Sequence, residues 1–253
     1  MPSGDAIARW MRQQLSLTGA RGFVVGLSGG VDSAVVARLA QLAAPAATLG
    51  ALLPCHSDPQ DEEDARLVAD HFSLPTVRVD LSHTYDAFVA DAQPPLRTVP
   101  AAMRDLPPAE GLRGRVPLAN IKARLRTVTL YFIANSLHYL NAGAGNRSEI
   151  AVGYFTKYGD GAADLLPIGH LLKGEVRALA QDLTIPATII ERTPSAGLWL
   201  GQTDEEEMGF SYAELERYLK EGPQDVSPAL AMRIERLIRL SDHKRALPPI
   251  PEL

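Results

Sequence analysis

Short apolar runs alternate with amphipathic segments along the first part of the chain. Each run is too short for a helix, and each is followed by Gly, Pro, Ser or Asp, which favours strands. The predicted strands are Gly22–Leu27, Thr48–Leu53, Thr76–Asp80 and about Leu137–Ala142. Between them, periodic apolar positions predict helices at Asp32–Leu42, Gln60–His71 and Leu118–Asn135, and the first fifteen residues predict one more.

This alternation predicts an α/β fold with a doubly wound, Rossmann-like parallel sheet. We expect one domain over residues 1–253, since neither a repeat nor a low-complexity linker divides the chain. In such sheets a ligand binds beyond the carboxyl ends of the strands, where the strand order reverses. Functional residues are therefore expected in the loops that follow strands.

Two regions depart from the alternating pattern. Gln93–Pro117 contains six prolines and predicts an irregular connection. Asn141–Pro167 is rich in glycine and charged residues, too polar for a core and too patterned for a linker. We interpret the second region as part of a functional site.

Composition narrows the classes of partner. The chain has 253 residues and a formal net charge of −5, which gives no global electrostatic case for nucleic acid or an anionic membrane. Cys55 is the only cysteine, so an intrachain disulfide and a multi-cysteine metal site are excluded, as is usual in a reducing compartment. The start of the chain lacks the apolar segment of a signal peptide, and Pro45 interrupts the most apolar stretch. These features predict a cytoplasmic protein without a membrane span.

The strongest chemical motif follows the first predicted strand. A Ser/Gly-rich turn leads directly into a helix there, so backbone N–H groups and the positive end of the helix dipole point at one place, which suits phosphate. The alternative is a glycine-rich turn in which Asp32 and Ser33 cap the helix. The motif is neither a Walker A loop nor a dinucleotide fingerprint. Its residues are Gly26, Leu27, Ser28, Gly29, Gly30, Val31, Asp32 and Ser33.

This loop resembles the pyrophosphate loop of the N-type ATP pyrophosphatases, which have an adenine nucleotide alpha hydrolase-like fold. A second run, Gly145–Gly161, resembles the corresponding segment of the NAD synthetases in that superfamily. The resemblance continues through shorter motifs, in the same order, from about Trp10 to Arg245. These motifs are NIKAR before the run, then DLLP, Lys173, PSAGLW, GQTDE and DHKR.

The resemblance implies ammonia-dependent amidation of deamido-NAD, in which ATP is cleaved to AMP and pyrophosphate through an adenylated intermediate. It assigns Asp32 and Lys173 to catalysis, and the loop with Ala144, Lys173 and Ser195 to ATP. It further implies that Mg²⁺ is held by Asp32 and Glu149, with Asp160 as ligand of a second ion, which agrees with the preference of Mg²⁺ for hard oxygen ligands. The residues that it assigns to deamido-NAD are Arg124, Lys157, Asp164, His243 and Lys244.

Taken alone, several of these residues have simpler explanations. Glu149 is also typical of an exposed carboxylate at a helix start, and His243 of a solvated, charged tail.

Two positions depart from the family. Ala144 replaces a threonine hydroxyl that contacts ATP, a loss of about 1 kcal/mol if nothing replaces that hydrogen bond. Ser195 stands where some members have threonine and keeps the hydroxyl.

The resemblance also implies a homodimer whose substrate site spans the interface. The helix predicted at Leu118–Asn135 carries Leu125, Val128, Phe132 and Ile133 at amphipathic spacing, which fits either this interface or the core. Ammonia rather than glutamine is the expected nitrogen source, because the motifs leave no space between them for a glutaminase, and Cys55 and His56 are neighbours that point apart in an extended segment. A tRNA-modifying relative and a nucleotide-binding regulatory module remain the alternatives.

Overall fold

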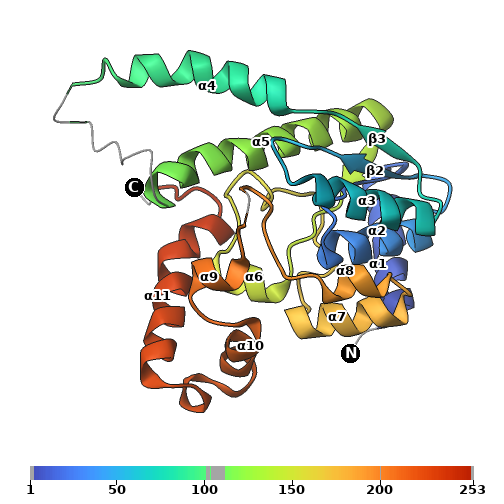
Figure 1. Ribbon diagram of the computed structural model, residues 1–253. Helices are drawn as coiled ribbons and strands as arrows, with labels where there is room; N and C mark the ends of the chain where they lie inside the picture. The colour runs from blue at the N-terminus through green and yellow to red at the C-terminus, as the bar shows by residue number, and fades with distance from the viewer. Residues whose placement is uncertain (1–2, 101–102, 104–111, 200, 252–253) are drawn as a thin grey trace.

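A four-stranded parallel sheet lies at the centre of the computed structural model, which describes residues 3–100, 103, 112–199 and 201–251. The strands follow the order β3-β2-β1-β4, so the chain reverses direction across the sheet between β1 and β4 (Figure 1). Phe23 pairs with Thr48 of β2 and with Leu140 of β4. All four predicted strands are confirmed: β1 (Gly22–Gly26), β2 (Thr48–Leu52), β3 (Thr76–Arg78) and β4 (Tyr139–Asn141).

Alternate residues of the strands face two different hydrophobic clusters. Phe23 and Val25 face the larger cluster, and Val24 between them faces the smaller one, as the two-residue period of a strand requires. The larger cluster is covered by five helices, α1 (Gly4–Thr18), α2 (Val31–Ala43), α3 (Pro59–His71), α7 (Lys173–Asp182) and α8 (Ala187–Glu191). With α5 on the opposite face, the sheet is doubly wound.

The smaller cluster forms between the sheet and the long helix α5 (Leu112–Leu137). Leu125 and Ile133 of α5 pack against it, while Val128 and Phe132 are 67% and 72% exposed. The amphipathic helix predicted here therefore has both a core face and an exposed apolar face. Helix α4 (Ser82–Leu96) has no buried residue and extends beside α5, away from the body of the molecule (Figure 1).

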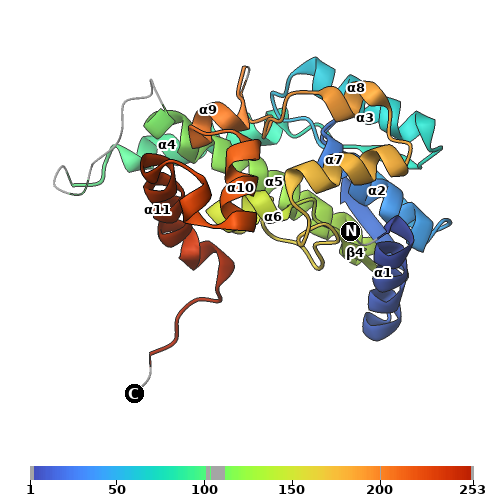
Figure 2. The same cartoon turned by 90° about the horizontal axis from the view of Figure 1, so that it is seen from below.

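A third cluster joins the C-terminal helices to the segment after β4. Its members come from α6 (Arg147–Val152), α9 (Asp204–Met208), α10 (Tyr212–Glu221) and α11 (Pro228–Arg245), with a short 3₁₀ turn at Pro223–Asp225. Figure 2 shows α9, α10 and α11 grouped together beside α6 and the long helix α5. This packing carries Tyr212 and the end of α11 to the site described below.

The predicted irregular connection at Gln93–Pro117 is wrong at both ends. Helix α4 continues through Pro94 and Pro95, and α5 begins at Leu112, so Pro117 lies within its first turns. Proline costs least near a helix terminus, where few backbone hydrogen bonds are lost. Pro107 and Pro108 lie outside the described residues. Within the described part of the chain, no helix has both the length and the apolar character needed to cross a membrane.

Candidate active site

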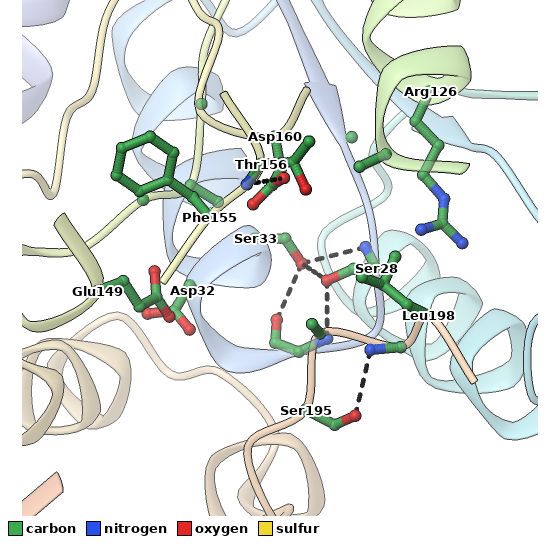
Figure 3. A pocket seen from close by; sticks show the side chains of 18 of the residues that line it. Ser28, Asp32, Ser33, Arg126, Glu149, Phe155, Thr156, Asp160, Ser195 and Leu198 are labelled. Atoms are coloured by element: carbon green, nitrogen blue, oxygen red, sulfur yellow. Dashed lines mark hydrogen bonds between the residues drawn. The ribbon is translucent and has the colours of Figure 1, made fainter. Parts of the chain in front are cut away.

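A cavity of about 690 Å³ opens at the carboxyl ends of the strands, beside the point where the strand order reverses. Its wall is formed by the loop after β1, the loop after β2, the segment after β4, the first half of α5, residues 192–199 and Gln202. The place agrees with the expectation from the sequence for a doubly wound sheet. Figure 3 shows side chains from these segments converging on one space.

The Ser/Gly loop is held in shape by its own hydroxyl groups. Ser33 Oγ donates to Gly30 O at 2.9 Å and accepts from Ser28 N at 3.2 Å, and the two serine hydroxyls are 3.0 Å apart (Figure 3). Gly29 has φ +81°, and a Cβ there would lie 2.5 Å from Asp61 O, so the turn requires glycine. Gly30 is the N-cap of α2 without a side-chain cap, and Asp32 is directed elsewhere. The capping alternative therefore does not describe Asp32.

Asp32, Glu149 and Lys173 come from three helices and meet in the cavity wall. Lys173 begins α7, and its Nζ donates to Asp32 Oδ2 and lies 3.6 Å from Glu149 Oε1. The side chains are 4% exposed for Lys173, 15% for Asp32 and 17% for Glu149. Glu149 is therefore not the exposed helix-start carboxylate that its position alone could indicate, because it lies with Asp32 in the cavity wall and the ammonium group stands between them.

The charges of this cluster perturb one another strongly. Burial and the charge of Asp32 raise the pKa of Glu149 to about 8. Burial lowers the pKa of Lys173, but Asp32 and Glu149 outweigh that effect and raise it above the usual lysine value. Two carboxylates around one ammonium leave an excess negative charge when both are ionised, so the cluster favours a further cation.

Residues not assigned from the sequence complete the surroundings of this cluster. Asn146 is fully buried, donates from Nδ2 to Asp32 Oδ1 at 3.1 Å, and forms a capping box with Glu149. Tyr212 donates from Oη to Asp204 Oδ2 at 2.8 Å and lies 3.4 Å from Glu149 Oε1. The spacing of Asn146 and Glu149 is a sequence signal for the capping box. Tyr212 and Asp204 are brought in by the C-terminal helices. Asp204 lies in the GQTDE motif, to which the sequence analysis gave no role, and Tyr212 had no local signal.

The residues present fit Mg²⁺. Asp32 and Glu149 offer hard carboxylate oxygens at one place, and two carboxylates with phosphate oxygens and water are a usual magnesium environment. Asp204, 3% exposed, has a buried Oδ1 without a hydrogen-bond partner nearby. Asp160 lies elsewhere in the wall, where its Oδ1 accepts from Thr156 N at 2.9 Å (Figure 3). Among the described residues no group of three or more His, Cys, Asp or Glu side chains has the geometry of a metal site.

Other residues assigned to ATP also line the cavity. Ala144 follows β4 beside Gly143 and Gly145, and Ser195 lies in the segment between α8 and α9. Ser195 Oγ accepts from Gly197 N at 3.1 Å. Arg126, which the sequence analysis passed over, points into the same cavity and donates to Leu53 O and Ser57 Oγ. Its position four residues after Lys122 on α5 is the signal that could have indicated it.

The residues assigned to deamido-NAD lie toward the outside of the cavity, around a second hollow of about 260 Å³ lined by Lys157 and Lys244. Arg124 is exposed and donates to Lys157 O at 3.2 Å, and Lys157 Nζ donates to His243 O. Lys244 Nζ donates to Gly153 O and Phe155 O at 2.7 and 2.8 Å. These contacts bring Arg124, Lys157, His243 and Lys244 together.

Two further residues named in the sequence analysis are Asp164, assigned to deamido-NAD, and Cys55, for which no catalytic role was expected. Asp164 Oδ2 accepts from Asn141 N at 2.8 Å at the end of β4, and its Oδ1 lies 3.4 Å from Tyr131 Oη. Cys55 is fully buried with Sγ 3.8 Å from Leu81 O, whereas His56 Nε2 lies 2.8 Å from Asp86 Oδ1. The ring of His56 is thus engaged away from the thiol, which gives Cys55 no catalytic partner.

The chain matches the family model described as NAD synthase over residues 4–248. An NH(3)-dependent NAD(+) synthetase from Carboxydothermus hydrogenoformans is 46% identical over 249 residues, covering 98% of this chain and 96% of that protein. The solved structure of an NMN synthetase from Francisella tularensis has a TM-score of 0.87 and 35% identity, covering 99% of this chain and 97% of that one. An NH3-dependent NAD synthetase from Campylobacter jejuni has a TM-score of 0.78 and 26% identity, covering 98% and 97%. The chain belongs to the NAD synthase family.

Proposed function

We propose that this protein makes NAD from deamido-NAD, ATP and ammonia, releasing AMP and pyrophosphate. The observation that carries the proposal is the buried group of Asp32, Glu149 and Lys173 beside a Ser/Gly loop suited to phosphate. In the first step an oxygen of the nicotinate carboxylate bonds to the α-phosphorus of ATP, and the bond to pyrophosphate breaks. In the second, ammonia bonds to the acyl carbon, AMP leaves, and the nitrogen loses a proton.

This chain's residues act mainly by holding charge and position. The N–H groups at the start of α2 would bind the β- and γ-phosphates, and Lys173 would neutralise charge that develops on the leaving pyrophosphate. Asp32 and Glu149 would hold Mg²⁺, which when bound supplies charge neutralisation to the phosphates. Ser195 would donate to the triphosphate from the segment beside the Ser/Gly loop.

The dinucleotide is favoured by the curated relative at 46% identity, which is called an NAD(+) synthetase. The likeness to an NMN synthetase at a TM-score of 0.87 makes nicotinate mononucleotide a second candidate substrate. Both substrates carry the same nicotinate carboxylate, so the chemistry at Asp32 and Lys173 is unchanged. What differs is the adenylate half, which would extend toward Arg124 and Lys157.

We also propose a homodimer. Val128 and Phe132 lie on α5 at intervals of four residues from Arg124, so the exposed apolar face is continuous with a residue assigned to the substrate. A second copy packed on this face would cover the apolar side chains and stand beside the outer end of the cavity. The dimer would thus complete the deamido-NAD site.

The test incubates purified protein with ATP, Mg²⁺, ammonium and either deamido-NAD or nicotinate mononucleotide, and separates the products by chromatography. We expect NAD, AMP and pyrophosphate in equal amounts, with the dinucleotide preferred. Formation of ADP and phosphate would contradict the proposal. Faster turnover of nicotinate mononucleotide than of deamido-NAD would identify the mononucleotide as the substrate. A parallel reaction with glutamine in place of ammonium should make little NAD, and Cys55→Ser should leave the ammonium reaction intact.

A further inference from the structure

The segment between α8 and α9, which the structure describes at residues 192–199 and 201–203, forms one wall of the cavity and carries Ser195. Figure 3 shows Ser195 and Leu198 on this segment, next to the Ser/Gly loop. Gly197 and Gly201 have φ of +61° and +75°, so the backbone makes two turns that favour glycine. A segment with this backbone needs contacts from outside itself to keep Ser195 in one place.

Both ends of the segment are fastened by side chains of the segment itself. At the start, Arg192 donates to Asp64 Oδ2 at 2.6 Å and to Asp61 Oδ1 at 2.5 Å, both on α3. At the far end, Gln202 Oε1 accepts from Leu198 N at 2.8 Å, and Gln202 Nε2 donates to Glu207 Oε2 at 2.7 Å. In the middle of the segment, the backbone carbonyl oxygen of Leu198 accepts a hydrogen bond from a side chain on another element.

That residue is Lys122 of α5, which is 8% exposed. Its Nζ donates to Leu198 O at 2.8 Å, lies 3.5 Å from His56 O, and lies 5.5 Å from the centre of the Tyr85 ring. His56 belongs to the loop after β2, which also borders the cavity. The buried ammonium therefore joins two loops through backbone carbonyl groups and has no carboxylate as an ion-pair partner among the described residues.

A buried ammonium of this kind is a poor way to stabilise a core. Burial lowers the pKa of Lys122, which is the direction expected for a charge that has lost water. An apolar side chain of similar volume stabilises a protein interior as well as or better than a buried charge does. What lysine supplies and methionine does not is a directional hydrogen bond to Leu198 O.

We propose that Lys122 is a positioning residue that holds residues 192–199 against the cavity through Leu198 O and thereby sets Ser195 for the triphosphate of ATP. The role of Ser195 in binding ATP rests on the proposed function, whereas the hydrogen bond from Lys122 to Leu198, called the link below, does not depend on it. Without the link, the segment would stay attached at Arg192 and Gln202 and move at its middle. ATP would then be bound less tightly, with less effect on the chemical step.

The chain offers its own optical reporter for this link. Trp199 follows Leu198 and lines the cavity, and the second tryptophan, Trp10, lies on α1 and is 41% exposed. A Trp10→Phe background therefore leaves Trp199 as the source of tryptophan fluorescence. Lys122→Met in this background removes the donor at similar volume. Lys220→Met is the matched control, because Lys220 is exposed on α10 and pairs only weakly with Glu216 at 3.8 Å.

The experiment measures acrylamide quenching of Trp199 without substrates, and then KM for ATP and kcat. For Lys122→Met we expect clearly stronger quenching and a KM for ATP raised about tenfold, the loss expected for one charge-assisted hydrogen bond, with a smaller change in kcat. Lys122→Arg, which keeps a donor, should restore most of both properties. Lys220→Met should match the background in both.

Unchanged quenching in a folded Lys122→Met protein would overturn the proposal, as would an equal change in Lys220→Met. A lower melting temperature with normal quenching and normal KM would likewise assign Lys122 to stability alone. If Lys122→Met does not fold, Gln202→Met releases the same residue, Leu198, from its other side and should also increase quenching. If the background protein shows no turnover, the proposed function fails and the quenching result still decides on the link.

Discussion

The two ends of the cavity differ in how their charged side chains are arranged. At the phosphate end, formed by Ser28–Ser33 with Glu149 and Lys173, charged groups are buried and meet one another across three helices. At the outer end, formed by Arg124, Lys157, His243 and Lys244, the arginine and the two lysines lie near the surface and donate to backbone carbonyl groups, one of which is that of His243. The phosphate end is formed by side chains that already contact one another, while Lys157 and Lys244 of the outer end line a hollow that the described residues leave open.

This difference indicates which part of the reaction each end serves. A buried, rigid arrangement suits charge that develops during phosphoryl transfer, because prearranged groups need no reorganisation in the transition state. An open end with long cationic side chains suits recognition of a substrate that must enter and leave. The exposed apolar face of α5 borders the open end, which is the basis for expecting a second copy there.

The largest effect is expected at the phosphate end, from Asp32→Asn. Turnover should fall by at least about a hundredfold, the range for losing one prearranged electrostatic group. The variant should also unfold more easily, by about 3–5 kcal/mol, because it leaves the buried Lys173 without its closest partner. Steady-state kinetics and urea unfolding measure the two effects separately.

The control for this prediction is the double variant Asp32→Asn with Lys173→Met, which removes both charges. It should recover much of the lost stability and none of the activity. If Asp32→Asn is as stable and active as the unmodified protein at saturating Mg²⁺, the phosphate end is not the preformed charge cluster described here.

A second effect should appear at the border between the ends, from Phe132→Glu on α5. A charge on the exposed apolar face should separate the proposed dimer, and kcat/KM for deamido-NAD should fall roughly a hundredfold, the equivalent of about two charge-assisted hydrogen bonds. Sedimentation gives the oligomeric state in the same samples. Leu17→Glu, on the exposed side of α1, is the control. A monomeric variant with full activity would show that one chain completes the outer end.

A third, smaller effect should show that the two ends of the cavity bind different substrates. Arg124→Ala should raise KM for deamido-NAD about tenfold, as expected for one lost charge-assisted contact, and leave KM for ATP unchanged. Arg66→Ala is the matched control, because Arg66 is exposed on α3 and pairs with Glu62. Equal changes in both KM values would mean that Arg124 supports the cavity as a whole. Isothermal titration with each substrate checks the assignment without turnover.

The sequence predicted the framework of this molecule more fully than its details. Strand positions followed from apolar runs such as Gly22–Leu27, because a strand buried on both faces needs apolar side chains throughout. The extent of α4 and α5 did not follow, since prolines near helix ends cost too little to stop them. Local patterns thus located the four strands and the helices α1, α2, α3 and α5, with α5 begun too late, while α4 and the helices after β4 were not predicted.

For the candidate site, the sequence likewise indicated the residues but not their contacts. Asp32, Glu149 and Lys173 were indicated by the resemblance, and the parallel sheet predicted that Asp32 and Glu149, which both follow strands, would lie at the same edge. Their burial, the Tyr212 contact and the link from Lys122 to Leu198 depend on segments far apart in the chain. No local spacing encodes such contacts, because they are set by how the C-terminal helices and α5 pack on the sheet.

The smallest predicted effect concerns Ala144, where the resemblance implies that the phosphate end lacks a threonine hydroxyl of the family. Ala144 lines the cavity in the turn after β4, so a hydroxyl added there would face the nucleotide space. Ala144→Thr should lower KM for ATP up to about fivefold, because one neutral hydrogen bond contributes roughly 1 kcal/mol. Ala144→Val, which adds the same branching without a hydroxyl, is the matched control and should leave KM unchanged or raise it. If threonine and valine have the same effect, the hydroxyl finds no acceptor, and water or a neighbouring side chain already satisfies ATP at this point.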